Sequence, residues 1–230
     1  MHDPDGTGEK PRVVAIDGPS GSGKSTVARQ VADRLGLKVL DTGAMYRAVT
    51  LAVLERGISL DDEIACTRVA SDACVDVGPI VLLEGMDVSA QIRGPEVTAA
   101  VSVVAAHPEV RRVLVDRQRR WVDENDGGVL EGRDIGTVVF PNATVKVFLT
   151  ASDHERAERR HRDEILQGRM GADTDAVRAA LVRRDDLDSK RPFSPLRAAT
   201  DAVIIDTTSC TVSEVVEEIV HRVRDAQERS

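Results

Sequence analysis

The sequence has few aromatic residues. One Trp, one Tyr and three Phe are all that occur among its 230 residues. Proteins that bind single-stranded nucleic acids stack the bases on aromatic side chains, so this scarcity argues against that class. The formal net charge of −8 argues against it too, because a nucleic-acid-binding surface needs an excess of basic groups. We therefore expect no nucleic-acid partner.

The sequence also lacks long hydrophobic runs and paired cysteines. No apolar run approaches the roughly 18 residues of a membrane-spanning helix. Residues 1–10 are polar and aperiodic, without the apolar core of a signal peptide, and we interpret them as a disordered arm. The three cysteines form no C-x-x-C pair, which argues against a disulfide framework or a zinc site. These absences favour a cytoplasmic protein with no membrane partner.

Lysine is scarce as well. Only five of the 31 Lys and Arg residues are lysines, so 26 are arginines. Guanidinium groups bind phosphate and carboxylate oxygens through paired hydrogen bonds. A high-GC coding bias would produce the same excess, so the positions of the arginines carry more information than their number.

Short apolar segments alternate with segments of helical periodicity along most of the chain. Strands are predicted at residues 13–17, 38–41, 129–131, 145–150 and 202–206. Helices are predicted at residues 25–35, 44–56, 96–106, 108–123, 174–190 and 211–224, with a further arginine-rich helix that begins after Ser152 and breaks at 168–171. This alternation is typical of a parallel α/β sheet, and we expect residues 11–230 to form one domain.

The segment between residues 73 and 92 differs from this alternation. Three short extended pieces, at 74–77, 80–84 and 87–89, are separated by the turn pairs Gly78-Pro79 and Gly85-Met86. Such spacing predicts a small antiparallel meander inserted into the α/β core.

A glycine-rich phosphate loop (residues 18–25, GPSGSGKS) follows the first predicted strand and precedes a predicted helix. Its pattern G-x-x-x-x-G-K-[ST] turns backbone N–H groups toward phosphate oxygens, with the Lys24 ammonium and the helix N-terminus adding positive charge. The Ser25 hydroxyl is the expected Mg²⁺ ligand. We predict that ATP binds to Gly18, Pro19, Ser20, Gly21, Ser22, Gly23, Lys24, Ser25 and Thr26.

The base-reading motif of GTPases is missing. Neither Asn125 nor Asn142 is followed by the lysine of N-K-x-D. The chain is also short for an ATPase motor that carries its target domain. A phosphotransferase that acts on a small molecule is the remaining class.

Three further segments carry chemistry at predicted strand ends or on a helix: DTGAMYR at 41–47, EGRDIGTVVFP at 131–141 and RDDLDSKR at 184–191. Together with the phosphate loop they resemble the bacterial cytidylate kinases, of the nucleoside monophosphate kinase group, over residues 13–220. The resemblance implies a P-loop kinase core with a five-stranded parallel sheet flanked by helices. It also implies a nucleotide-monophosphate-binding insertion at about 60–125, which holds the meander, and a helical lid at about 152–171.

The resemblance further implies an ATP- and Mg²⁺-dependent enzyme that phosphorylates CMP and dCMP, and it suggests roles for individual residues. Arg47 and Arg133 would hold the acceptor phosphate. Cytosine would meet Ser102, Arg111 and Asp134, with Thr42 and Tyr46 lining the pocket and Arg191 beside Asp134; Arg184 and Asp188 would contact the ribose. Many family members have serine where Thr42 stands, which keeps the hydroxyl but changes the packing.

Elementary chemistry agrees with such an enzyme. At neutral pH a nucleoside monophosphate is largely a dianion and needs no general base, so catalysis reduces to positioning and charge neutralisation. Lys24, Arg47 and Arg133 would supply positive charge, and Arg156, Arg159 and Arg160 of the lid would close over the site and exclude water. A carboxylate at Asp134 accepts a hydrogen bond from the cytosine amine but opposes the uracil carbonyl, which predicts CMP and dCMP over UMP.

Alternatives remain at this stage. Asp134 could instead be the general base of a kinase that phosphorylates a hydroxyl group, or the chain could be a nucleotide-sensing module without turnover. Asp17 and Asp41, at strand ends, either cap turns or contact Mg²⁺ through water. We expect the protein to be a monomer.

Overall fold

The computed structural model describes residues 12–166 and 173–228. The predicted disordered arm at 1–10 and the predicted helix break at 168–171 lie outside these ranges. Five parallel strands form the central sheet in the order β2-β6-β1-β7-β8. They span Arg12–Asp17 (β1), Val39–Asp41 (β2), Gly127–Gly132 (β6), Val145–Thr150 (β7) and Val203–Asp206 (β8). The prediction of a five-stranded parallel sheet is confirmed.

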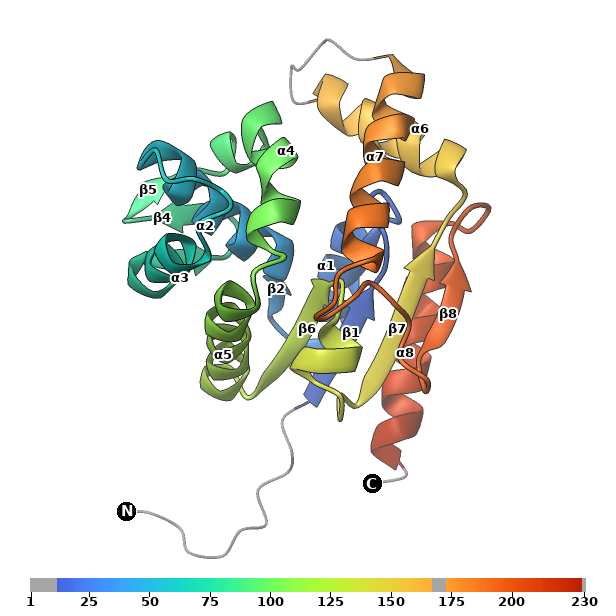
Figure 1. Cartoon of the computed structure of the whole chain (residues 1–230). Coiled ribbons are helices and arrows are strands. Elements are labelled where there is room, and N and C mark those ends of the chain that lie inside the picture. The colour runs from blue at the N-terminus through green and yellow to red at the C-terminus, as the bar shows by residue number, and fades with distance from the viewer. Residues whose placement is uncertain (1–11, 167–172, 229–230) are drawn as a thin grey trace, which may run out of the picture.

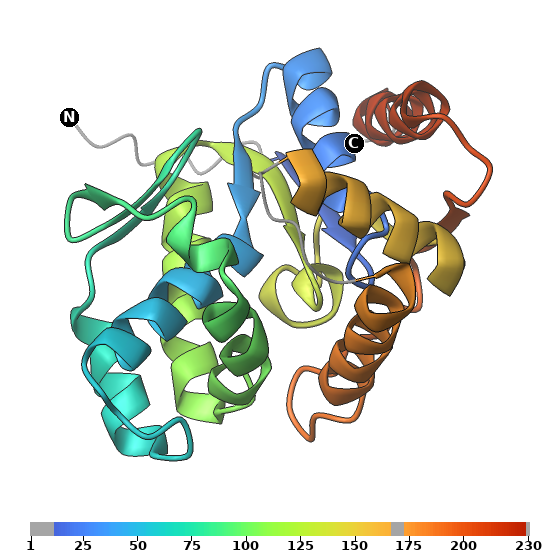
Figure 2. The same cartoon turned by 90° about the horizontal axis from the view of Figure 1, so that it is seen from above.

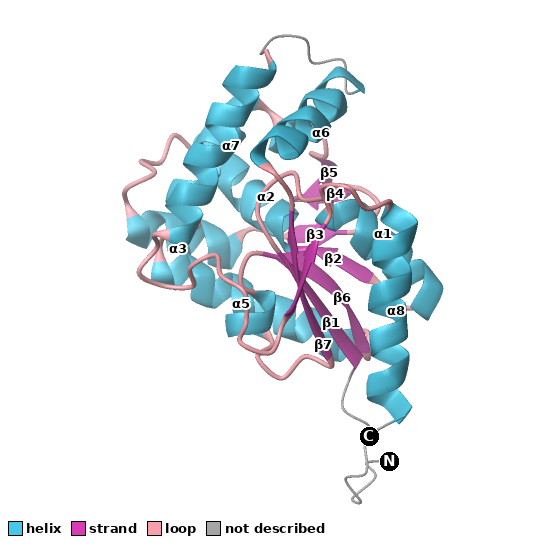
Figure 3. Cartoon of the chain, turned by 90° about the vertical axis from the view of Figure 1, so that its right-hand side faces the viewer, coloured by secondary structure: helices cyan, strands magenta, loops and turns pink. Residues whose placement is uncertain are grey.

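Both faces of the sheet are buried, as the continuous apolar run of β1 predicts. Val14 and Ile16 of β1 pack against the helices Lys24–Leu35 (α1) and Val212–Glu228 (α8), which lie together on one face (Figure 3). Val13 and Ala15 point to the opposite face, which is covered by the helices of residues 42–124. These helices are Thr42–Glu55 (α2), Glu63–Asp72 (α3), Pro95–Val104 (α4) and Pro108–Glu124 (α5).

The predicted meander is also confirmed. Val75–Val77 (β3), Val81–Leu83 (β4) and Met86–Asp87 (β5) form a three-stranded antiparallel sheet beside α2. The helix α3 was not predicted. It begins after Asp62, whose carboxylate accepts a hydrogen bond from Ala65 N at 2.9 Å, and it buries only small side chains, so its apolar periodicity is weak.

Two helices stand above the carboxyl ends of the strands on the side away from α2–α5. They are Asp153–Leu166 (α6) and Thr174–Ser189 (α7), seen from above in Figure 2. Ser152 caps α6 as predicted, since its Oγ accepts a hydrogen bond from Glu155 N at 3.3 Å. The carboxyl edge of the sheet therefore lies between α2–α5 and the pair α6–α7.

Two details of β6 and its following loop differ from the prediction. Gly127 and Gly128 are part of the strand, and a Cβ on Gly128 would lie 2.5 Å from the Trp121 ring, so the glycine lets the two segments approach closely. A short π-helix at Ile135–Val139, for which the sequence analysis predicted no element, follows Asp134. Within the described residues no helix has the length and apolar character of a membrane span.

Candidate active site

The phosphate loop joins β1 to α1 at the carboxyl edge of the sheet. Its glycines are required where other backbone approaches: a Cβ on Gly18 would lie 2.1 Å from the Leu149 carbonyl oxygen, and one on Gly21 would lie 2.8 Å from that of Arg156. Gly21 also has φ 78°, a left-handed conformation that disfavours other residues. The loop is therefore held between β7 and α6 in a fixed shape.

Lys24 is buried beside this loop. Its Nζ donates a hydrogen bond to Pro19 O at 2.6 Å, and the residue is 7% exposed. Burial, and then the Arg133 guanidinium, lower the pKa of Lys24 below its ordinary value. An ammonium so poorly solvated has a strong electrostatic preference for an anionic partner.

Glu131, at the end of β6, is the acidic neighbour of this lysine. It is 5% exposed, and burial followed by the nearby Asp41 raises its pKa, while Lys24 and a hydrogen bond with Ser25 act in the opposite direction. The carboxylates of Glu131 and Asp41 and the hydroxyl of Ser25 are oxygen donors of the kind that Mg²⁺ prefers. No preformed group of three or more His, Cys, Asp or Glu side chains for a metal exists in the part of the chain described here.

A cleft of about 630 Å³ extends from the phosphate loop to the first turn of α5, where Arg111 lies. All but three of the predicted site residues line it; the exceptions are Gly18, Pro19 and Arg156. The lining includes Ser20, Gly21, Ser22, Gly23, Lys24, Ser25, Thr26, Thr42, Tyr46, Arg47, Ser102, Arg111, Arg133, Asp134, Arg160, Arg184, Asp188 and Arg191. Residues from seven separate segments of the chain therefore share one cleft.

Four arginines that line the cleft repel one another electrostatically and form a cluster: Arg47, Arg133, Arg160 and Arg184. Burial lowers the pKa of Arg47 well below its ordinary value, and the Arg184 and Arg160 guanidinium groups lower it further. Burial, and then Arg133, likewise lowers the pKa of Arg184 to about 10. The Nε of Arg184 is buried and has no hydrogen-bond partner within the described residues. Such mutual repulsion with unused donors fits a site for a highly charged anion.

Arg133 is paired with a buried carboxylate, that of Asp188. Its Nε donates to Asp188 Oδ2 at 2.9 Å and its Nη1 donates to Gly18 O at 2.8 Å. Burial opposes the charged form, but Asp188 and Asp185 outweigh it and raise the pKa of Arg133. Arg133 therefore connects the phosphate loop to α7.

The far end of the cleft holds a buried pair. Arg111 Nη2 donates to Asp134 Oδ2 at 2.5 Å, and the Arg111 guanidinium lies over the Tyr46 ring at 5.1 Å. Ser102 Oγ donates to Asp188 Oδ1 at 3.3 Å, and Arg191 Nη1 donates to Ala105 O at 3.3 Å. The result is a compact pocket with an aromatic wall and several fixed hydrogen-bonding groups.

Arg156, predicted to close over the site as part of the lid, is not among the residues that line the cleft in this structure. It is 5% exposed and lies behind the phosphate loop, where it donates to Ser20 O at 3.0 Å and to Asp153 and Asp185. Arg160 does line the cleft, with Nε donating to Glu164 Oε1 at 2.9 Å. The first turn of α6 presses on the loop, so the arginine at its start cannot also face the cleft.

Asp17 and Asp41 both accept hydrogen bonds from backbone N–H groups at turns, as one of the two interpretations predicted. Asp17 accepts hydrogen bonds from Ile135 N at 2.8 Å and Gly136 N at 2.7 Å, and burial raises its pKa to about 6. Asp41 accepts one from Ala44 N at 2.9 Å at the start of α2 and also lines the cleft. Asp17 therefore fixes the backbone directly after Asp134.

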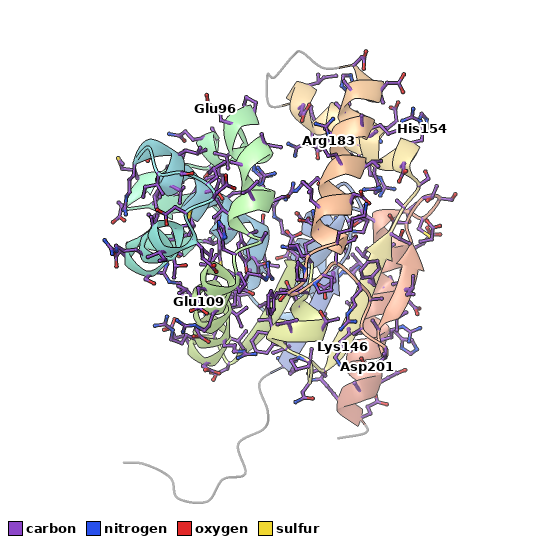
Figure 4. The ribbon with its side chains drawn as sticks, in the orientation of Figure 1. Glu96, Glu109, Lys146, His154, Arg183 and Asp201 are labelled. Atoms are coloured by element: carbon purple, nitrogen blue, oxygen red, sulfur yellow. The ribbon has the colours of Figure 1, made fainter. Side chains whose placement is uncertain are left out.

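Two residues of the site were missed from the sequence, Glu131 and Asp185. Glu131 directly precedes the Gly-Arg-Asp segment at the end of a predicted strand, and this position is a sequence signal for a site residue. Asp185 accepts a hydrogen bond from Ser20 N at 3.1 Å, a contact between residues 165 positions apart that no local pattern indicates. A second cavity, of about 350 Å³, lies at the opposite end of the molecule around the Lys146–Asp201 ion pair (Figure 4) and contains no predicted site residue.

Comparison with known proteins agrees with this geometry. The family model described as cytidylate kinase matches residues 14–225. A cytidylate kinase of Nocardia farcinica is 51% identical over 216 residues, covering 92% of this chain and 93% of the relative. One of Geobacillus kaustophilus is 49% identical over 217 residues, covering 92% and 96%.

The solved structures carry weaker likeness. The crystal structure of an uncharacterized protein from Eubacterium ventriosum aligns with a TM-score of 0.53 at 14% identity, covering 93% of this chain and 98% of that one. At this identity the likeness concerns the fold alone. The family model and the two curated relatives together settle membership: this chain belongs to the cytidylate kinase family.

Proposed function

We propose that this protein transfers the γ-phosphoryl group of ATP to CMP or dCMP, giving ADP and CDP or dCDP. One observation carries the proposal: a single cleft of about 630 Å³ has a phosphate loop at one end, a polar pocket at the other and four arginines between them. A bimolecular phosphoryl transfer needs both anions in line and their charge neutralised, which this order of groups supplies.

At the phosphate-loop end, backbone N–H groups and Lys24 would bind the β- and γ-phosphates of ATP. For this, Lys24 Nζ would exchange its hydrogen bond to Pro19 O for phosphate oxygens. The Ser25 hydroxyl would hold Mg²⁺, with Glu131 and Asp41 acting on its water ligands. The bound ion supplies neutralising charge to the phosphate oxygens.

In the middle of the cleft, Arg47, Arg133 and Arg160 would surround the acceptor phosphate. Since the dianion of CMP is itself the nucleophile, these residues orient and neutralise it and no side chain needs to remove a proton. Arg184 lies in the same cluster and would reach both this phosphate and the ribose, with Asp188 accepting from a ribose hydroxyl.

In the far pocket, the cytosine ring would stand beside Tyr46 and Thr42. Asp134, whose second oxygen is held by Arg111, would accept a hydrogen bond from the exocyclic amine, and Ser102 and Arg191 complete the wall. Uracil would bring a carbonyl oxygen to the same carboxylate and leave a buried group unpaired, so UMP is the poorer substrate.

Two other functions fit the cleft less well. A kinase for a neutral hydroxyl acceptor would need Asp134 as a base, yet one carboxylate oxygen is bound by Arg111 at 2.5 Å, and a neutral acceptor has no use for four arginines. A sensing module without turnover would need no acceptor site. Both alternatives leave the arginine cluster unexplained.

The test is an ADP-release assay with ATP and Mg²⁺ across CMP, dCMP, UMP, AMP, GMP and neutral hydroxyl acceptors. CMP and dCMP are expected to exceed every other acceptor in kcat/KM by at least 100-fold. Equal rates with UMP would reject the role of Asp134, and turnover only with hydroxyl acceptors would reject the proposal.

We also propose that the protein works as a monomer in the cytoplasm, without nucleic acid or membrane partners. One chain supplies both ends of the cleft, and the three cysteines, Cys66, Cys74 and Cys210, are free. Light scattering after size-exclusion chromatography tests the monomer, for which a mass near 24.9 kDa is expected.

A further inference from the structure

A carboxylate on α7 fastens the phosphate loop to both α6 and α7. Asp185 Oδ1 accepts a hydrogen bond from Ser20 N at 3.1 Å, and Asp185 Oδ2 accepts one from Arg156 Nη1. The same Arg156 nitrogen donates to Ser20 O at 3.0 Å. We call these three residues the Asp185 clamp; the N–H and C=O groups of Ser20 are both engaged in it.

The clamp is shielded from water. Arg156 is 5% exposed, so its charge needs a carboxylate partner close by. Its two partners are unequal, since the side chain of Asp153 is 59% exposed and that of Asp185 only 13%. Because a charge-assisted hydrogen bond is stronger in the less solvated place, Asp185 is the main partner of Arg156.

The clamp also borders the reacting region, although neither charged member lines the cleft. Asp185 acts electrostatically on Lys24, where it opposes the fall in pKa caused by burial and by Arg133. The next turn of α6 carries Arg160 into the cleft, one helical turn after Arg156. The seating of α6 on the loop therefore sets where Arg160 stands relative to Lys24.

We propose that Asp185 is a positioning residue for phosphoryl transfer, which holds Ser20 and Arg156 so that α6 stays seated on the phosphate loop. In this account Arg156 acts through the loop and not on the reacting phosphates. The inference rests on the proposed kinase function and extends it to a residue outside the cleft.

The test compares D185N with D186N. Asp186 is the next residue on α7, and its carboxylate pairs with Lys190 at 2.5 Å on the surface. Loss of a shielded charged hydrogen bond is expected to lower kcat/KM for ATP by about 10- to 100-fold in D185N. The KM for CMP should stay within about twofold of wild type, and D186N should behave as wild type. Equal kinetics of D185N and D186N overturn the proposal, as does a loss confined to the KM for CMP.

A second experiment separates the clamp from a direct role of Arg156. If the clamp acts as a unit, the double variant R156Q/D185N is no slower than the slower single variant. Losses that multiply mean that Arg156 contacts the phosphates itself, and they overturn the proposal. Melting temperatures check the fold, and R156K replaces D185N if the latter does not fold; wild-type kinetics of R156K then count against the clamp.

Failure of the proposed function is visible separately, in wild-type protein that does not phosphorylate CMP. In that case ATP affinity measured by calorimetry takes the place of the rate. Weaker binding by D185N than by D186N supports the clamp, and equal binding overturns it.

Discussion

The two ends of the cleft are built in different ways. The phosphate-loop end is one continuous segment in which backbone N–H groups, fixed by glycines, and one lysine face the ligand. The other end, which we call the arginine end and which comprises the far pocket and the arginine cluster beside it, is assembled from side chains of several elements: Arg47 on α2, Ser102 on α4, Arg111 on α5, Asp134 after β6 and Asp188 on α7. A backbone site recognises what all nucleoside triphosphates share, whereas a side-chain site distinguishes one acceptor from another.

The largest loss of activity should come from changing Lys24, the one side chain that faces the ligand at the phosphate-loop end. Lys24→Ala is expected to lower kcat by about 10³-fold, because Lys24 is the only lysine among the described residues that line the cleft. Lys38→Ala, at an exposed position after α1, is the control and should leave kcat unchanged. Near-normal turnover of the Lys24 variant in the ADP-release assay would contradict the assignment of this end.

The same difference between the two ends explains which parts of the site could be predicted from the sequence alone. The phosphate loop, β1 and α1 were predicted because glycine spacing, an apolar run and a helix stop are local signals. The arginine end is joined by contacts such as Arg111–Asp134 and Ser102–Asp188, and its residues were assigned through a family resemblance and not from periodicity.

The elements that were missed have tertiary causes. The π-helix at Ile135–Val139 has β-branched residues that favour an extended conformation. It forms where two of its backbone N–H groups donate hydrogen bonds to Asp17, 118 and 119 positions away in the sequence. The contact of Arg156 with Ser20 O was not predicted, because an arginine-rich helix gives no sign of which of its turns packs against another loop. Such placements depend on packing that a single sequence does not display.

A second test concerns selectivity at the arginine end. Asp134→Asn is expected to lower kcat/KM for CMP by about 100-fold and to reduce the preference for CMP over UMP, since an amide can donate to the uracil carbonyl. Steady-state kinetics with both nucleotides give the ratio. An unchanged CMP-to-UMP ratio means that the base is read elsewhere.

A third test concerns Asp17, which directly precedes the phosphate loop and binds the backbone that follows Asp134. Burial raises its pKa from 3.8 to about 6, so the folded protein binds this proton more tightly than the unfolded chain. Its contribution to stability is therefore greatest at low pH and falls as pH rises through about 4 to 6. Between pH 4.5 and 7.5 wild type should lose about 2 kcal/mol of unfolding free energy relative to Asp17→Asn.

Urea denaturation of both proteins at the two pH values measures this difference. Titrations shared by the two proteins cancel in the comparison. Equal pH dependence of wild type and Asp17→Asn would show that the carboxylate does not titrate in this range.

The smallest effect should come from Arg184. Because burial and Arg133 disfavour its charged form, Arg184→Gln should keep or raise the melting temperature while it raises the KM for CMP by about tenfold. Arg183→Gln, at the exposed neighbouring position, is the matched control. A lower melting temperature with an unchanged KM would assign Arg184 a structural role and remove it from the acceptor site.

The most direct test of the shared cleft is calorimetric titration with a molecule that joins adenosine and cytidine through five phosphates. If one cleft binds both nucleotides with their phosphates facing each other, one molecule binds per chain and both ATP and CMP compete with it. If the molecule is displaced by only one of the two nucleotides, or if two molecules bind per chain, the ends of the cleft do not serve a single transfer reaction.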